Sequence, residues 1–133
     1  MFKKLNKKGF TLAELLVVVA IVGVLVAISI PIFTNQLEKA REATDLANIR
    51  AAYAECSAAV MTETTTGKAK YTKGTGASEE VTLHQTNDGW EDSNKNATIG
   101  DKVANTDFNF AKDHTKATVA ISDAGKLTIT MGK

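Results

Sequence analysis

The sequence predicts an α+β protein in which one long N-terminal helix precedes a small antiparallel sheet. Three observations carry this prediction. An apolar run covers residues 10–33 and contains a single charged side chain, Glu14. Apolar residues then recur at three- and four-residue spacing up to residue 61, which is the period of an amphipathic helix. Towards the C-terminus apolar and polar residues alternate, as in strands with one buried face.

Composition and charge limit the possible functions. A length of 133 residues favours one domain. The net charge of +1 includes the lysines of the first nine residues; without them, 12 basic residues face 15 acidic ones, a balance of −3. Such a chain lacks the basic surface that binds nucleic-acid phosphates, so we expect no direct nucleic-acid binding. The one cysteine, Cys56, rules out an intrachain disulfide, and its place in an apolar row predicts a core residue.

The N-terminal third has the composition of a membrane span. Four lysines precede the apolar run and place the N-terminus in the cytoplasm. The 24 residues from Phe10 to Phe33 extend over about 36 Å as a helix, enough to cross a hydrocarbon core of about 30 Å. An ordinary secretory signal has an apolar core of only about 7–15 residues. We therefore expect residues 10–33 to span the membrane.

Glu14 is the exception within this run and requires an explanation. The residues Thr11-Leu12-Ala13-Glu14 match a capping box, in which Glu14 would bond the first turn of the helix and complement its dipole. A cap contributes about 1 kcal/mol, whereas a charge at the centre of a membrane helix costs about 2.5–3.5 kcal/mol. Capping alone is therefore an incomplete explanation, and a cationic partner for Glu14 is expected.

The helix is predicted to continue beyond the membrane, from Asn35 to Met61. Gly23 and Pro31 mark places where it can kink, because proline removes one backbone hydrogen bond. Arg41 is positioned to meet Glu38 and Asp45 on the helix surface. One side of this segment carries the apolar row Leu46, Ile49, Tyr53, Cys56 and Val60. The charged residues are expected elsewhere around the helix, namely Glu38, Arg41, Glu42, Asp45, Arg50 and Glu55.

The C-terminal half is expected to form the sheet. Residues 117–121 and 127–131 alternate around the turn Ser122-Asp123-Ala124-Gly125, which predicts an antiparallel hairpin. Shorter alternating patterns occur at Val81 and Leu83 and at Phe108 and Phe110. Two polar stretches, residues 68–78 and 84–105, are expected to be loops.

No motif in this half predicts chemistry. His84 and His114 lie in separate polar segments, so surface histidines are expected rather than a metal site. Residues 92–96 resemble the start of a calcium loop, but the following glycine and the closing acid are replaced by Ala97 and Val103. We expect a solvated acidic loop, no cofactor and no enzymatic activity.

The segment Lys8-Gly9-Phe10-Thr11-Leu12-Ala13-Glu14, the apolar run and Pro31 resemble the class III signal of type IV pilins and pseudopilins. The resemblance implies the type IV pilin fold and cleavage by a prepilin peptidase after Gly9, followed by N-methylation of Phe10. It divides the chain into a leader (1–9), a membrane or filament-core segment (10–33) and a head (34–133). It also implies that Glu14 pairs with the Phe10 ammonium of a neighbouring subunit.

Three functions are compatible with this resemblance. The favoured one is a structural subunit of a type IV pilus, serving adhesion, twitching motility or surface contact. The second is a pseudopilin of a type II secretion or DNA-uptake system, and the third a membrane-anchored extracytoplasmic domain that does not polymerise. Expected partners are the prepilin peptidase, other subunits of a helical filament and a membrane assembly platform. The expected location is the cytoplasmic membrane before assembly and the cell surface afterwards. The chain lacks the paired cysteines of many Gram-negative pilins and has Ala13 where a larger aliphatic residue is frequent.

Overall fold

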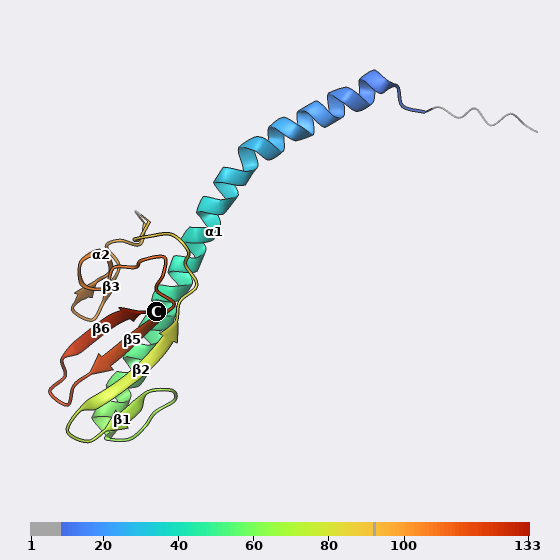
Figure 1. Cartoon of the computed structure of the whole chain (residues 1–133). Helices are drawn as coiled ribbons and strands as arrows, with labels where there is room; N and C mark the ends of the chain where they lie inside the picture. Colours follow the sequence, from blue (N-terminus) through green and yellow to red (C-terminus); the bar gives the residue numbers. More distant parts are fainter. Residues whose placement is uncertain (1–8, 92) are drawn as a thin grey trace, which may run out of the picture. The chain divides into compact units, whose positions relative to one another are not determined.

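The computed structural model describes residues 9–91 and 93–133 and has the predicted α+β arrangement of one long helix and a small antiparallel sheet (Figure 1). Helix α1 extends from Leu12 to Thr62. The four-stranded sheet has the order β1-β2-β5-β6, with strands Lys70–Thr72, Gly76–Thr82, Lys116–Ile121 and Leu127–Gly132. A second, two-stranded sheet and a short helix lie between β2 and β5: β3 (Thr98–Ile99), β4 (Lys102–Val103) and α2 (Ala104–Asp107).

Two compact units divide the chain, one ending at Asn35 and the other extending from Gln36 to Lys133. In the first unit the large apolar side chains are exposed, with relative exposures between 48% at Val26 and 91% at Phe10. Length and composition would allow this part of α1 to cross a membrane, and none of its most apolar 18-residue window is buried within the protein. The apolar surface of the first unit is therefore not buried by its own chain and is suited to contact with a membrane or another protein.

Helix α1 continues through both Gly23 and Pro31. Proline lacks an amide hydrogen, so one carbonyl of the preceding turn loses its helical bond. Hydroxyl groups on either side of Pro31 bond to the helix backbone: Ser29 Oγ donates to the Leu25 carbonyl at 2.7 Å, and Thr34 Oγ1 donates to the Pro31 carbonyl at 3.0 Å. A kink at Gly23 or Pro31 remains a prediction.

The hydrophobic core of the second unit forms where α1 packs against the sheet. Ile49, Cys56 and Val119 are completely buried there. The Cys56 thiol donates to the Val119 carbonyl at 3.6 Å, and burial raises the pKa of Cys56 to about 11. This thiol stays protonated at neutral pH, so the prediction of an inert core cysteine is confirmed. Other core residues are Leu46, Ala52, Ala59, Ala77, Val81, Ala117, Ile121, Leu127 and Ile129.

The predicted C-terminal hairpin is confirmed, with Ile121 opposite Leu127 and Ala117 opposite Met131. The prediction of a loop at residues 68–78 is wrong, because β1 and the start of β2 lie there. Strand β2 pairs along its length with β5, and this pairing supplies the backbone bonds that its polar composition does not predict.

The prediction of a strand at Phe108 and Phe110 is also wrong, since both residues follow α2 in a coil segment. The two side chains are buried nonetheless. Trp90 packs edge-on against Phe108 with 5.9 Å between ring centroids, and its indole donates to the Phe108 carbonyl at 3.2 Å. The alternation therefore reflects loop residues anchored in the core rather than the pleat of a strand. The expected loop at 84–105 is likewise interrupted by β3 and β4.

One prediction concerns Gly76, whose φ of +108° is a conformation that other residues rarely adopt. A Cβ at this position would lie 2.0 Å from the Ile121 carbonyl oxygen of β5. Gly76→Ala should therefore lower the free energy of unfolding by more than about 2 kcal/mol. The measurement is urea unfolding of the whole chain in detergent micelles, followed by fluorescence of Trp90, the sole tryptophan.

The matched control is Gly74→Ala. Gly74 also has a positive φ, +82°, but a Cβ there would meet nothing within 4 Å. The free energy of unfolding of this variant should fall by only about 1 kcal/mol, because of backbone strain. Equal losses in the two variants would show that the approach of β5 to Gly76 does not matter.

Candidate functional site

The first candidate site is the start of α1. Gly9 and Phe10 precede the helix and are exposed, as is the first turn. The backbone amide of Thr11 donates to Glu14 Oε2 at 2.8 Å, and the Glu14 amide donates to Thr11 Oγ1 at 3.2 Å. These reciprocal bonds are those of a capping box, so this prediction is confirmed.

The capping bonds leave the Glu14 carboxylate with further positions that can accept hydrogen bonds. A carboxylate has two oxygens and about four acceptor positions, and the Thr11 amide takes one of them. The side chain is exposed, and its charge is not neutralised by the cap. Glu14 can therefore hold its own helix end and still accept a cation. The lysines at positions 3, 4, 7 and 8 lie outside the described residues.

The second candidate site is a row of three buried carboxylates on α1, in the second unit. Glu38, Glu42 and Asp45 have relative exposures of 2%, 1% and 0%. Their spacing of four and three residues places them on one side of the helix. The interpretation of these acids as residues of the helix surface is therefore wrong, because the segment 84–94 covers them.

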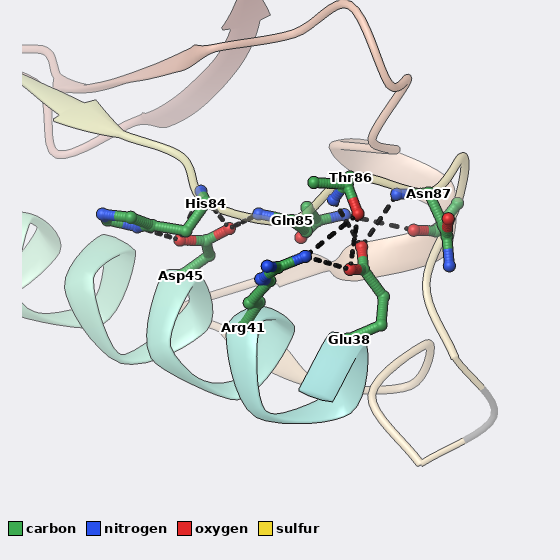
Figure 2. A network of polar contacts seen from close by, with 8 residues as sticks. Glu38, Arg41, Asp45, His84, Gln85, Thr86 and Asn87 are labelled. Carbon is green, nitrogen blue, oxygen red and sulfur yellow. Dashed lines mark hydrogen bonds and ion pairs between the residues drawn. The ribbon is translucent and has the colours of Figure 1, made fainter. Parts of the chain in front are cut away.

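Glu38 binds the middle of this segment (Figure 2). It accepts hydrogen bonds from the backbone amides of Thr86 and Asn87 and from the Thr86 hydroxyl, the latter at 2.8 Å. Arg41 contacts Glu38 at 3.3 Å, as predicted. Its other bond goes to Thr86 Oγ1 at 3.2 Å, so Arg41 closes the cluster from the solvent side.

Asp45 binds the start of the segment (Figure 2). Its carboxylate accepts the amide of His84 at 2.8 Å and the amide of Gln85 at 2.9 Å. The His84 ring nitrogen Nδ1 lies 2.8 Å from the same group. His84 is about half exposed, which agrees with the expectation of a surface histidine.

Glu42 binds the far end of the segment. Both its oxygens lie 3.0 Å from the Glu91 amide, and the Asn94 side chain donates to Oε2 at 2.9 Å. The structure thus uses Asn94, from the stretch compared with a calcium loop, as a donor to a carboxylate; Asp92 lies outside the described residues. No three of the described Asp, Glu, His and Cys residues converge as metal ligands would.

In a helix or strand, backbone amides donate to backbone carbonyls. In the covering segment, the three carboxylates accept hydrogen bonds from amides in place of such carbonyls. Because buried amides need acceptors, α1 supplies them from side chains, and the segment 84–94 is fixed against the helix. Thr86, Asn87 and Asp88 remain exposed. The row therefore sets the position of an exposed surface loop.

Two of these acids respond differently to pH. Burial alone would raise the pKa of Glu38, but the bonds from Asn87, Thr86 and Arg41 hold it below its ordinary value. Glu38 thus contributes stability that is lost as the pH falls through the lowered pKa. Burial raises the pKa of Glu42, with the charges of Glu91 and Glu38 adding to the effect and outweighing its hydrogen bonds. Its contribution is largest when it is protonated and declines as the pH rises.

Comparison with known proteins bears on the first site. Residues 4–30 match the family model described as the prokaryotic N-terminal methylation motif. The chain is 43% identical over 53 residues to the type IV narrow pilus major component PilA5 of Thermus thermophilus, covering 38% of this chain and 46% of the relative. It is 49% identical over 36 residues to the fimbrial protein EcpB of Eikenella corrodens, covering 27% and 23%.

The N-terminal part of the chain is therefore similar to the N-terminal part of type IV pilins. The motif and the apolar α1 fit a membrane-anchored precursor and a pilus at the cell surface. In each case the match spans less than half of the relative's length. No solved structure matches the chain significantly. The pilin resemblance therefore rests on the N-terminal segment, whereas the carboxylate row lies in the head.

Sequence reasoning missed the carboxylate row. Two features of the sequence could have indicated it. Three acids stand at helical spacing beside the apolar row, and a long stretch without periodicity follows, whose backbone amides need acceptors. Nothing in the sequence indicates that residues 84–94 return to this part of α1. That contact joins residues 39 to 52 positions apart and depends on the folded head.

We predict that Glu38→Gln lowers the free energy of unfolding at neutral pH by about 1–3 kcal/mol, because the amide group brings donors towards the donors of Thr86 and Asn87. The deficit should shrink as the pH falls, since Glu38 of the natural chain then becomes protonated. Urea unfolding monitored by Trp90 at several pH values measures this.

Glu42→Gln is the matched control, with the same change of charge one helical turn away. It should lose less stability at neutral pH, because ionised Glu42 is the disfavoured form. Equal, pH-independent losses in the two variants would contradict the assignment.

Proposed function

We propose that this chain is a structural subunit of a type IV pilus. The observation that carries the proposal is the methylation motif at residues 4–30 together with the exposed apolar part of α1 up to residue 33, whose one acid, Glu14, lies in the first turn. An isolated membrane anchor needs the apolar helix, and an acid there would serve it only as a helix cap. A subunit that assembles through this helix needs both.

Processing is the first step of the proposed function. Gly9 and Phe10 lie outside α1, so the bond between them is not protected by helical hydrogen bonds. We propose that a prepilin peptidase cuts this bond, removes residues 1–9 and methylates the new amino group of Phe10. Cleavage creates a positive charge four residues before Glu14, at the very end of the apolar segment.

Assembly is the second step. An ammonium and a carboxylate attract strongly when water is excluded, and either one alone is costly to bury. We propose that the Phe10 ammonium of one subunit pairs with Glu14 of its neighbour and that this pair sets the stagger between copies. The apolar residues between 10 and 33 supply the contact area. Head-to-tail contacts of this kind do not close and produce a helical filament.

The relatives favour a pilus over the alternatives. Both are named as pilus or fimbrial proteins, and neither as a secretion or DNA-uptake component. We therefore place the subunit in the cytoplasmic membrane before assembly, in contact with a membrane assembly platform, and on the cell surface afterwards. Adhesion, twitching motility and surface contact are the proposed roles of the filament. A structural subunit of this kind needs no catalytic group.

The cleavage site is tested by the mass of the mature chain. We expect a protein that begins at Phe10 and carries one methyl group on its amino nitrogen, identified by mass spectrometry of the N-terminal peptide. In cells without prepilin peptidase the same measurement should give the leader intact. A natural chain that keeps its leader, or is cut near Phe33, would contradict the proposal.

The role of Glu14 is tested by separating its charge from its capping bond. Glu14→Gln keeps an acceptor for the Thr11 amide but removes the charge. Burying the Phe10 ammonium without its partner costs about 3–5 kcal/mol, so filament yield should fall by at least about tenfold. Electron microscopy of surface filaments and immunoblots of sheared material measure the yield.

The matched control is Thr11→Ala, which removes the hydroxyl bonded to the Glu14 amide and costs about 1 kcal/mol of helix stability. The charge remains, so filaments should form. Normal filaments with Gln at position 14 would contradict the pairing of Glu14 with the Phe10 ammonium, and a natural chain that is processed but forms no filaments would support a non-polymerising anchored domain. Processing of both variants is checked by mass, because an uncleaved chain cannot report on assembly.

A further inference from the structure

A fourth buried acid in the head differs from the row on α1. The alternation of β2 places Ala77, Glu79 and Val81 on its buried face. Glu79 is 9% exposed and stands opposite Val119 of β5, which is fully buried. An acid in a core-facing row of a strand is unusual unless it is paired.

Glu79 lacks the partners that its counterparts have. Glu38, Glu42 and Asp45 each accept several hydrogen bonds, whereas Glu79 Oε2 is buried and accepts none from the described residues. A buried carboxylate oxygen that receives no hydrogen bond is unfavourable as an ion. The folded head therefore needs a proton or a cation at this position.

Of the neighbouring groups, Glu55 can meet this need only by sharing a proton with Glu79. Glu55 is itself a carboxylate, which accepts the Lys68 amide at 2.8 Å. Burial raises the pKa of Glu79, and the charge of Glu55 and a hydrogen bond with the Glu55 carboxyl raise it further, while the Lys68 ammonium opposes these effects. The side chain of Lys68 is exposed and forms no ion pair with either acid within residues 9–91 and 93–133. Glu80 points to the other face of β2 and pairs with Lys116 at 2.9 Å.

These groups surround a hollow between α1 and β2. Its volume is about 310 Å³ and it opens to solvent. Glu55, Glu79, Asn48 and Thr82 line it, together with the basic residues Lys68 and His84 and with Ala51, Glu80 and Val81. Of the two basic residues, His84 contacts Asp45. Besides the two carboxylates, the Asn48 amide oxygen and the Thr82 hydroxyl are acceptors. A site with several acceptors and an excess of negative charge suits a cation that carries more than one N–H donor. The same described residues lack the three convergent ligands that a metal ion would need.

We propose that this hollow binds an organic cation, a guanidinium or ammonium group, with the carboxylates of Glu79 and Glu55 as its counter-ions. The cation takes the place of the proton that Glu79 otherwise needs. It can come from a basic side chain of a second copy of this chain or from a free amine in solution, because both present the same chemistry. The inference rests on the head alone and does not depend on the proposed pilus function.

The test uses the full chain in detergent micelles, with glutamate carboxyl carbons labelled for NMR. The ionisation midpoint of Glu79, assigned by its loss in Glu79→Gln, is measured with millimolar methylguanidinium chloride and with sodium chloride at equal ionic strength. Methylguanidinium should lower the midpoint by about one pH unit, because binding favours the ionised carboxylate. It should also shift the Glu55 carboxyl resonance in a saturable manner.

Two variants complete the test. Glu79→Gln should weaken methylguanidinium binding at Glu55 by at least about tenfold, which corresponds to the loss of about 1.4 kcal/mol. Glu63→Gln has the same charge change at an exposed position and should bind like the natural chain. Trp90 fluorescence checks that both variants fold, and Gln at position 79 mimics the protonated acid in shape.

Dilution of the protein separates the two sources of the cation. If a side chain of another copy occupies the hollow, the Glu79 midpoint rises on dilution and added methylguanidinium competes with self-association. If the natural ligand is a free amine, the midpoint is independent of protein concentration while the methylguanidinium effect remains. If methylguanidinium and sodium chloride give the same midpoint, the two carboxyl groups hold only a proton and the proposal is wrong.

Discussion

Every carboxylate of this chain that loses contact with water must receive hydrogen bonds, a proton or a cation, and much of the structure follows from how that requirement is met. At Glu38 and Asp45 backbone amides of a distant segment meet it. At Glu42 the balance favours the protonated acid, because burial and neighbouring charge outweigh the bonds received. At Glu14 the helix end supplies one bond in the single chain, and the proposed filament supplies the cation.

The same requirement explains how a head with little regular structure keeps a defined surface. The described residues of the segment 84–94, which are 84–91, 93 and 94, form no strand or helix. Its amides are held by side chains from α1, and Trp90 anchors it in the core beside Phe108. Such an arrangement allows an exposed position such as Asn87, which binds Glu38 through its backbone amide, to change without loss of the backbone position. The head lacks a disulfide, so these bonds and the packing of Cys56, Ile49 and Val119 hold its elements together.

Different parts of the chain were predictable to different degrees. Local patterns were sufficient for α1, for its capping box at Thr11 and Glu14 and for the hairpin of β5 and β6, because their bonds join residues close in sequence. They were insufficient for β1 and β2. The polar residues of β2 pair with β5, a strand about 40 positions later, and β1 pairs in turn with β2. The alternation at Phe108 and Phe110 was misleading for a related reason, since core burial and not strand geometry produced it.

The sequence by itself determined the α+β class, the apolar segment with its one acid, the proposed cleavage position between Gly9 and Phe10, and the burial of Cys56. Each follows from composition, periodicity or a short motif, which depend on neighbours along the chain. Only the tertiary structure decided which acids of the head are buried and what each of them meets. Glu38, Glu42 and Asp45 resemble solvent-facing residues of a helix until the segment 84–94 folds over them, and Glu79 resembles a polar strand residue until α1 covers it. Burial and pairing of a charge depend on contacts between residues far apart in sequence, and no local pattern records them.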